Sequence, residues 1–70
     1  MKKRIFRVQG EYITLQNLLK AEGLVSTGGE AKYMILDGFV SVNGECESRR
    51  GRKLRSGDVI VFEKVEITVA

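Results

Sequence analysis

The spacing of apolar residues predicts two short helices in the first half of the chain. Three leucines follow one another at the helical spacing i, i+3 and i+4. With Thr14 as the N-cap and Gly23 after the last turn, they predict a first helix over Leu15–Glu22. Apolar positions with the same period predict a second helix over Gly28–Leu36, which Gly38 would end.

Alternating and continuous apolar runs predict strands before and after these helices. Asn43-Gly44 is a dipeptide strongly typical of a tight hairpin, and Ser56–Asp58 predicts a second turn. The predicted strands are Ile5–Val8, Phe39–Val42, a weak strand Glu45–Glu47, Val59–Phe62 and Val65–Val69. The basic residues between Glu47 and Ser56 are predicted to form a loop or a frayed extension of the preceding strand.

This order of elements indicates the α+β class, as a single domain over residues 1–70. Two short helices can bury their apolar stripes only against each other and one face of a sheet. We therefore expect two packed helices against a small, mostly antiparallel sheet. The predicted core consists of Leu15, Leu18, Leu19, Leu24, Ala31, Ile35, Val40, Val42, Val59 and Val61.

The absence of several residue types narrows the classes of function. The chain has no histidine and one cysteine, so Ser-His-Asp and Cys-His catalysis cannot occur within it, and a four-ligand zinc site is not expected. A chain of 70 residues also rarely forms the closed pocket that an enzyme or a cofactor needs. We therefore expect neither an enzyme nor a metal or cofactor site.

The same features predict where the protein acts. The longest uninterrupted apolar run is Val59–Phe62, far shorter than the roughly 20 residues of a membrane-spanning helix. No apolar segment follows the basic start, as it would in a secretory signal, and a lone cysteine fits a reducing compartment. We expect a cytoplasmic, monomeric protein without a membrane partner.

Positive charge is concentrated in two short segments of this chain. The net charge is +3, from 12 basic and 9 acidic residues. Nine of the basic residues form two clusters, which are Lys2, Lys3, Arg4 and Arg7, then Arg49, Arg50, Arg52, Lys53 and Arg55. Such segregation favours a polyanionic partner, because binding removes the repulsion and releases condensed counterions. The alternative is a solvated loop that carries charge for solubility.

No acid lies between Arg49 and Arg55, so we expect Arg49 and Arg50 to have no acidic partner. Glu47 is expected on the solvated surface, as are Glu11, Glu22, Glu45, Glu63 and Glu66. Replacing Arg49 and Arg50 by alanine should then weaken binding without lowering thermal stability. Tyr12 and Tyr33 could stack on nucleobases, although partial burial explains them at least as well, and Cys46 is expected to be half-buried or at an edge.

The start of the second predicted helix is a candidate anion-binding position. Thr27 followed by Glu30 fits a capping box, in which the Glu30 carboxylate turns back to the Thr27 N–H. Gly28 and Gly29 would let a phosphate approach free N–H groups at the positive end of the helix, with Lys32 one turn on. The Gly-Lys-Ser/Thr element of a P-loop is missing, and an ordinary capped turn is favoured when this segment is taken alone.

A longer pattern of leucine, glycine and valine positions covers most of the chain, from Thr14 to Phe62. It consists of Leu15…Leu19…Gly23-Leu24…Ser26…Ala31…Ile35…Gly38-x-Val40-x-Val42-Asn43-Gly44…Gly57-Asp58-x-Ile60. This pattern resembles the alpha-L RNA-binding motif, the S4 domain of small-subunit ribosomal proteins. It looks most similar to small standalone bacterial members of the YbcJ and YaaA type, in which the domain is the whole protein.

The resemblance implies binding of structured RNA, often ribosomal RNA or the ribosome, with no catalytic role. In the family, the two helices and the adjoining basic loop form the binding surface. Carried over to this chain, the implied RNA-binding residues are Thr27, Gly28, Gly29, Lys32, Asn43, Arg49, Arg50, Arg52 and Lys53.

The chain departs from the family pattern at the starts of both helices. Many members have Arg-Leu-Asp at the first helix, where this chain has Thr14-Leu15-Gln16. Many have Ser-Arg at the second, where Ser26 is followed here by Thr27-Gly28-Gly29. Two familiar basic contacts are therefore absent, so either the basic run carries the binding or the RNA target differs.

Two other classes of protein compete with an RNA-binding module. Sulfur carriers of the β-grasp type share the small size and the Val-Asn-Gly-Glu hairpin, but they resemble one another in a C-terminal Gly-Gly. This chain ends in Ile67–Ala70, which argues against that class. A protein-interaction module that uses its basic face on an acidic partner stays open as the alternative.

Overall fold

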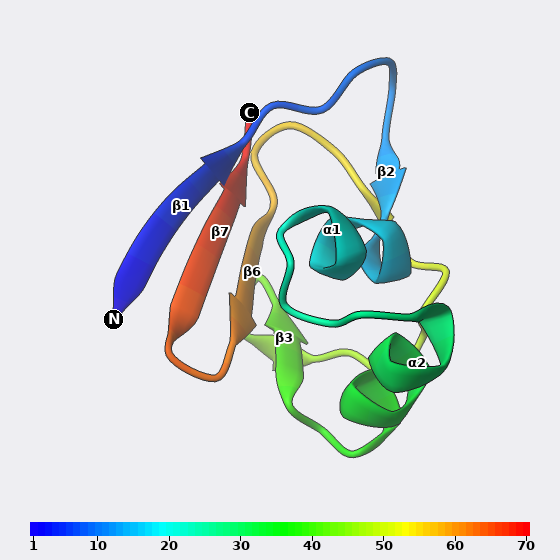
Figure 1. Cartoon of the computed structure of the whole chain (residues 1–70). Coiled ribbons are helices and arrows are strands. Elements are labelled where there is room, and N and C mark those ends of the chain that lie inside the picture. The colour runs from blue at the N-terminus through cyan, green and yellow to red at the C-terminus, as the bar shows by residue number, and fades with distance from the viewer.

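The computed structural model describes residues 1–70 and arranges them in two layers. In chain order the elements are β1 (Lys2–Phe6), β2 (Ile13–Thr14), α1 (Leu15–Ala21), α2 (Gly28–Leu36), β3 (Val40–Val42), β4 (Glu45–Cys46), β5 (Lys53–Leu54), β6 (Val59–Phe62) and β7 (Val65–Val69). Five strands form one sheet in the order β1-β7-β6-β3-β4, and β2 pairs with β5 in a separate sheet. Figure 1 shows the large sheet on one side and both helices on the other. The α+β class with two helices against a mostly antiparallel sheet is confirmed.

Both helices lie close to where the sequence predicts them. The bounds of α2 are as predicted, and α1 ends one residue earlier, with Glu22 as its C-cap. The side chain of Thr14 caps the start of α1. Gly23 and Gly38 follow the helices with φ of 71° and 85°, in the left-handed region that favours glycine. Neither helix has the length and apolar composition needed to cross a lipid bilayer.

The bounds predicted for the first strand, Ile5–Val8, were wrong. β1 instead pairs in parallel with β7, which sets Lys2 beside Val65 and Phe6 beside Val69. The other strand pairs of the large sheet are antiparallel. Local alternation could not reveal this start, because the strand is fixed by its partner at the other end of the chain.

The inward face of β6 was also predicted wrongly. Ile60 and Phe62 are buried, whereas the predicted core residues Val59 and Val61 are only half-buried. Ile60 pairs with Ile67 of β7, which is itself fully buried. An uninterrupted apolar strand carries no alternation of its own, so only its neighbours decide which side faces the core.

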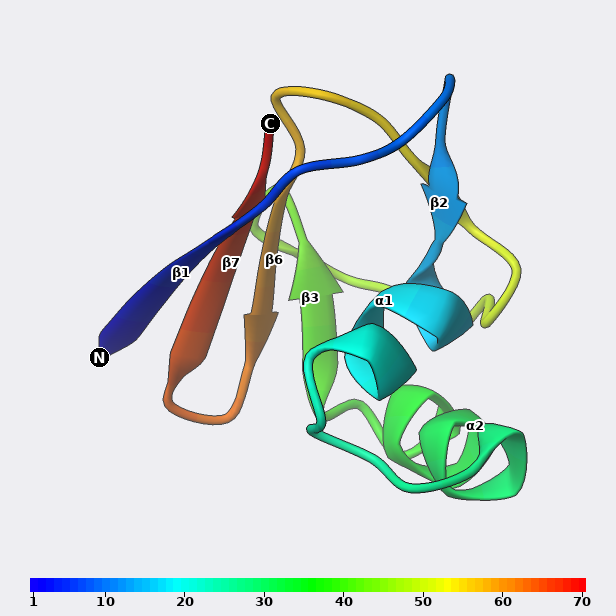
Figure 2. The ribbon, with the colours of Figure 1, turned by 45° about the horizontal axis from the view of Figure 1, so that its top comes forward.

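The core lies between the inward face of the sheet and the two helices, and much of it was predicted. The buried apolar residues are Leu15, Leu18, Leu19, Val25, Ala31, Ile35, Val40, Val42, Leu54, Ile60, Phe62, Ile67 and Val69. The predicted Leu24 is half-buried and packs against this cluster. Figure 2 shows the helices covering one face of the sheet only.

Residues 49–55, here called the basic segment, are not a simple loop. Their Lys53 and Leu54 form β5, which pairs with β2 through Thr14 and Ile13. Leu54 is fully buried and so anchors the segment in the core. This short strand was not predicted, because two residues within a charged run leave no periodic signal.

One member of the N-terminal basic cluster has a role within the fold. Nη1 of Arg4 on β1 donates a 3.0 Å hydrogen bond to the carbonyl of Glu22, and it lies 3.7 Å from the Glu22 carboxylate. A cation at this position interacts favourably with the negative end of α1. Arg4 therefore ties the edge strand to the helix layer.

Candidate nucleic-acid interface

The start of α1 holds the backbone of the basic segment. The N–H of Leu15 donates to the carbonyl of Arg52 at 2.9 Å, and the N–H of Gln16 donates to the carbonyl of Arg50 at 3.0 Å. These N–H groups have no partner inside a helix, so a loop carbonyl satisfies each of them. The basic segment is therefore fixed against the helix layer.

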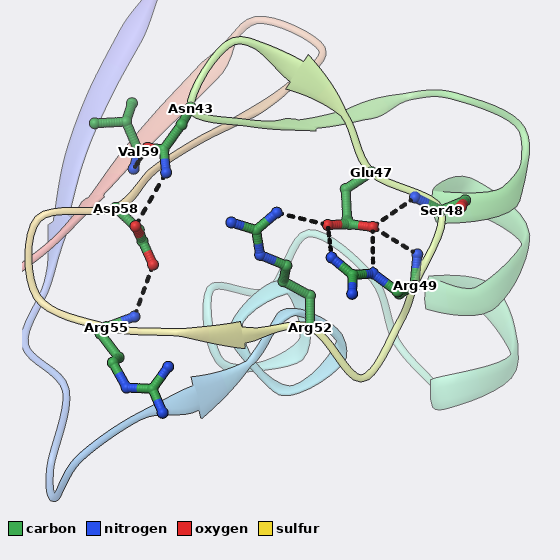
Figure 3. Close-up of polar contacts among 8 residues, drawn as sticks. All are labelled: Asn43, Glu47, Ser48, Arg49, Arg52, Arg55, Asp58 and Val59. Atoms are coloured by element: carbon green, nitrogen blue, oxygen red, sulfur yellow. Dashed lines mark hydrogen bonds and ion pairs between the residues drawn. The ribbon is translucent and has the colours of Figure 1, made fainter.

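A buried carboxylate organises the arginine side chains at the beginning of this segment. Glu47 is 7% exposed and accepts five hydrogen bonds. The backbone N–H groups of Ser48 and Arg49 donate to its Oε2, as does Nε of Arg49 at 3.1 Å. Nη2 of Arg49 and Nη1 of Arg52 donate to Oε1, at 3.2 Å and 2.8 Å (Figure 3).

The expectation that Glu47 is solvated and that Arg49 lacks an acidic partner was wrong. Side-chain hydrogen bonds from Arg49 first, and then from Arg52, lower the pKa of Glu47 from 4.5 to about 2, although burial opposes the shift. Side-chain hydrogen bonding between Arg49 and Glu47 also raises the pKa of Arg49. The signal in the sequence was a single acid two residues before the first arginine of the run, but proximity alone does not predict burial.

Two adjoining depressions follow the basic segment on the surface. The first, of about 340 Å³, is lined by Lys32, Leu36, Ser48, Arg49, Arg50 and Gly51. The second, of about 520 Å³, is lined by Arg49, Gly51, Arg52 and Lys53. They share Arg49 and Gly51, and no acidic residue lines either of them. We call their five cationic residues, which are Lys32, Arg49, Arg50, Arg52 and Lys53, the basic surface.

These five cations are not equivalent in their surroundings. Arg49 and Arg52 are paired with Glu47, with 72% and 31% of their side chains exposed. The side chains of Lys32 and Arg50 are exposed and form no ion pair within the protein. Since one carboxylate faces two arginines, the basic surface keeps a strong positive excess.

The start of α2 lies near this surface but does not line either depression. A Cβ on Gly28 would come within 3.1 Å of Nε2 of Gln16, the residue whose backbone N–H binds the basic segment. Thr27 caps the helix by accepting a hydrogen bond from the N–H of Glu30, as predicted. The Glu30 carboxylate accepts from the N–H of Ser26 at 2.6 Å, so its predicted partner Thr27 was wrong.

Asn43 lies in a separate network that joins two turns. Its Nδ2 donates to Oδ1 of Asp58 at 3.0 Å, and its Oδ1 accepts from the N–H of Val59 at 2.9 Å (Figure 3). The backbone N–H of Arg55 first, and then the Asn43 side chain, lower the pKa of Asp58. The Asn43-Gly44 and Gly57-Asp58 motifs are therefore parts of one hydrogen-bonded unit, whereas contact of Asn43 with RNA stays a prediction.

Comparison with known proteins identifies the family to which this sequence pattern belongs. The family model described as "S4 domain" matches residues 6–70. The chain is 43% identical over 56 residues to a Bacillus subtilis (strain 168) protein named "Probable ribosome maturation protein RlbA", covering 80% of this chain and 79% of that one. It is 37% identical over 51 residues to the Escherichia coli (strain K12) "Putative RNA-binding protein YbcJ", covering 73% of each chain. The chain therefore belongs to the S4 domain family.

Proposed function

We propose that this protein is a binding module for structured RNA, with ribosomal RNA or the ribosome as its target. The observation that carries this proposal is the basic surface, where α2 and the basic segment place five cations along adjoining depressions with no acidic lining. The names of the relatives support the same function, since one is described as a ribosome maturation protein and another as RNA-binding. We further propose that it acts as a cytoplasmic monomer and catalyses no reaction.

The proposed mechanism is recognition of the RNA backbone rather than of base edges. Arginine guanidinium groups match phosphate oxygens in a fork geometry, and each has five N–H donors. Glu47 uses two side-chain donors of Arg49 and one of Arg52, which leaves the others for phosphates. Lys32 and Arg50 bring unpaired charges to the same depression.

The Glu47 carboxylate supports this mechanism by ordering the cations before RNA arrives. Without an anion among them, the arginines of the basic segment would repel one another. The buried carboxylate offsets this repulsion and fixes two guanidinium groups in place, so less side-chain freedom is lost on binding. The exposed face of the segment stays positive.

The start of α2 is proposed as a second part of the RNA surface. Gly28 and Gly29 are the first residues of the helix, and neither N–H forms a hydrogen bond within the protein. Gly28 lies beside Gln16, whose backbone N–H binds the basic segment, so this helix start is near that segment. A phosphate between this helix end and Lys32 would gain about 0.3–1 kcal/mol from the helix dipole.

A salt titration tests the backbone-contact mechanism. If four to six phosphates are neutralised, log K for a folded RNA should fall against log salt with a slope of roughly −3 to −5. A slope near zero would exclude this mechanism. Polyglutamate serves as the control polyanion, because tighter binding to it than to RNA at equal salt would favour an acidic protein partner instead.

Crosslinking in cells identifies the target. We expect sequencing of the attached RNA to give discrete positions in ribosomal RNA. A dispersed set of RNAs, with no enriched position, would remove the ribosomal part of the proposal and leave general RNA binding.

A further inference from the structure

A third depression lies outside the basic surface and has a different lining. It measures about 340 Å³ and is lined by Phe6, Arg7, Val8, Gln9, Tyr12 and Ile13. Four of these residues are apolar or aromatic, and none lines the two depressions of the basic surface. Its lining residues lie at the end of β1, in the connection to β2 and at the start of β2. Figure 2 shows this connection crossing from the large sheet to β2. We call it the aromatic depression.

Tyr12 connects the aromatic depression with the basic segment. Its side chain is next to two cations, with Nζ of Lys53 at 4.9 Å and Cζ of Arg55 at 5.8 Å from the ring centroid. The pairing of β2 with β5 sets this geometry, because Thr14 lies opposite Lys53. Neither cation lines the depression, and Tyr12 is 41% exposed, so its side chain is accessible to a ligand.

The chemistry of this arrangement fits one kind of occupant. An apolar lining with an aromatic ring favours a flat, weakly polar group. A nucleobase is such a group, because each of the four bases can stack on tyrosine. Arg7 lines the depression and Lys53 lies beside the Tyr12 ring, so a group with negative charges next to a flat ring is favoured. An unpaired nucleotide within an RNA strand has both properties, with a flat base and flanking phosphates.

We propose that the aromatic depression binds an unpaired nucleobase of the RNA, stacked on Tyr12, with the neighbouring phosphates on Arg7 and on Lys53 or Arg55. This inference rests on the proposed function and adds a subsite for single-stranded RNA to it. The basic surface then holds the backbone of a folded region, and Lys53 links it to the subsite, since it lines the second basic depression and contacts Tyr12.

Tyrosine fluorescence gives a direct readout of such stacking. The chain has two tyrosines and no tryptophan, so in the Tyr33→Phe variant all tyrosine fluorescence comes from Tyr12. We expect a short oligouridine to quench this emission, and a fully paired RNA duplex of equal length to quench it far less. Unchanged emission on binding of the single strand would overturn the proposal.

Affinity measurements on the same two RNAs separate stacking from other roles of Tyr12. Tyr12→Leu should weaken binding of the single strand about tenfold, while binding of the duplex stays within about twofold. Tyr12→Phe should retain the affinity for both. Tyr33→Leu is the matched control, because Tyr33 is 72% exposed and lines none of the three depressions.

The outcomes distinguish this proposal from the proposed function. If the unaltered protein binds neither RNA, the proposed RNA-binding function fails and the subsite fails with it. If it binds both and Tyr12→Leu has no selective effect on the single strand, only the subsite is excluded. Equal losses on both RNAs would assign Tyr12 to holding Lys53 and Arg55, which also overturns the subsite.

Discussion

Nη1 of Arg52 donates a 2.8 Å hydrogen bond to Oε1 of Glu47, a carboxylate that is 7% exposed. An internal acid thus organises the cationic segment on which the proposed RNA binding depends. Because of this arrangement, the arginines of one short segment differ in what they contribute to stability and to ligand binding. Some of the cations contribute to stability as well as to binding, and others are available to the ligand alone.

Glu47→Gln should lower the free energy of unfolding by about 1–3 kcal/mol, because it weakens hydrogen bonds to charged groups around a buried position. For a domain of this size, each kcal/mol corresponds to a thermal midpoint lowered by about 4–8 °C. Thermal unfolding followed by circular dichroism measures this change. Glu45→Gln, at an exposed position two residues earlier in β4, is the control and should leave the midpoint unchanged.

The same carboxylate should make stability depend on pH in the acid range. The pKa of Glu47 is lowered from 4.5 to about 2 in the folded protein, so its contribution is fully present above pH 4.5. It is lost as the pH falls from 4.5 towards 2, because the unfolded chain then binds a proton more readily. Denaturant unfolding at a series of pH values should show this loss in the unaltered protein and a smaller one in Glu47→Gln. Identical pH profiles of stability for the two proteins would contradict this role of the Glu47 carboxylate.

Arg50→Ala and Arg52→Ala should separate binding from stability. Arg50 has no ion pair, so its loss should weaken RNA binding, reduce the salt slope by about 1 and leave the thermal midpoint unchanged. Arg52→Ala removes a partner of Glu47, so it should lower both the affinity for RNA and the thermal midpoint. Because Arg49 is also paired, the double change Arg49→Ala with Arg50→Ala is now expected to lower stability. Equal midpoints for both single variants would contradict this distinction.

Lys32→Glu should weaken RNA binding several times more than Lys64→Glu. Lys32 lines the first basic depression, whereas Lys64 lies in the turn between β6 and β7, which Figure 1 shows away from α2. Both changes alter the net charge by the same amount, so fluorescence anisotropy at equal ionic strength isolates position from total charge. Equal losses would mean that only the overall charge matters.

Asn43→Gly and Asn43→Ala should differ in stability, although both remove the hydrogen bonds to Asp58 and Val59. Asn43 has a φ of 53°, a conformation that glycine adopts freely and alanine does not. We expect Asn43→Ala to be less stable than Asn43→Gly by about 1 kcal/mol in chemical denaturation. RNA affinity, measured where both variants are folded, tests the predicted RNA contact of Asn43, and unchanged affinity would restrict this residue to the turn.

The sequence alone was sufficient for features that neighbouring residues decide. Both helices follow from apolar spacing and from Thr14, Gly23 and Gly38, since capping and left-handed turns act over a few residues. The Asn43-Gly44 hairpin and the S4 resemblance came from the same kind of local pattern. Five of the nine implied RNA-binding residues were found together on one surface, although their contact with RNA stays a prediction.

Tertiary structure decided the relationships between residues that are distant in sequence. β1 takes its start from parallel pairing with β7, and β6 takes its inward face from Ile60 beside Ile67. The proximity of Lys32 to Arg50 depends on how α2 packs beside the basic segment. The burial of Glu47 depends on the fold around it, because a charged residue is buried only where partners such as Arg49 and Arg52 surround it. Periodicity records which residues are apolar, but register and packing determine which of them meet.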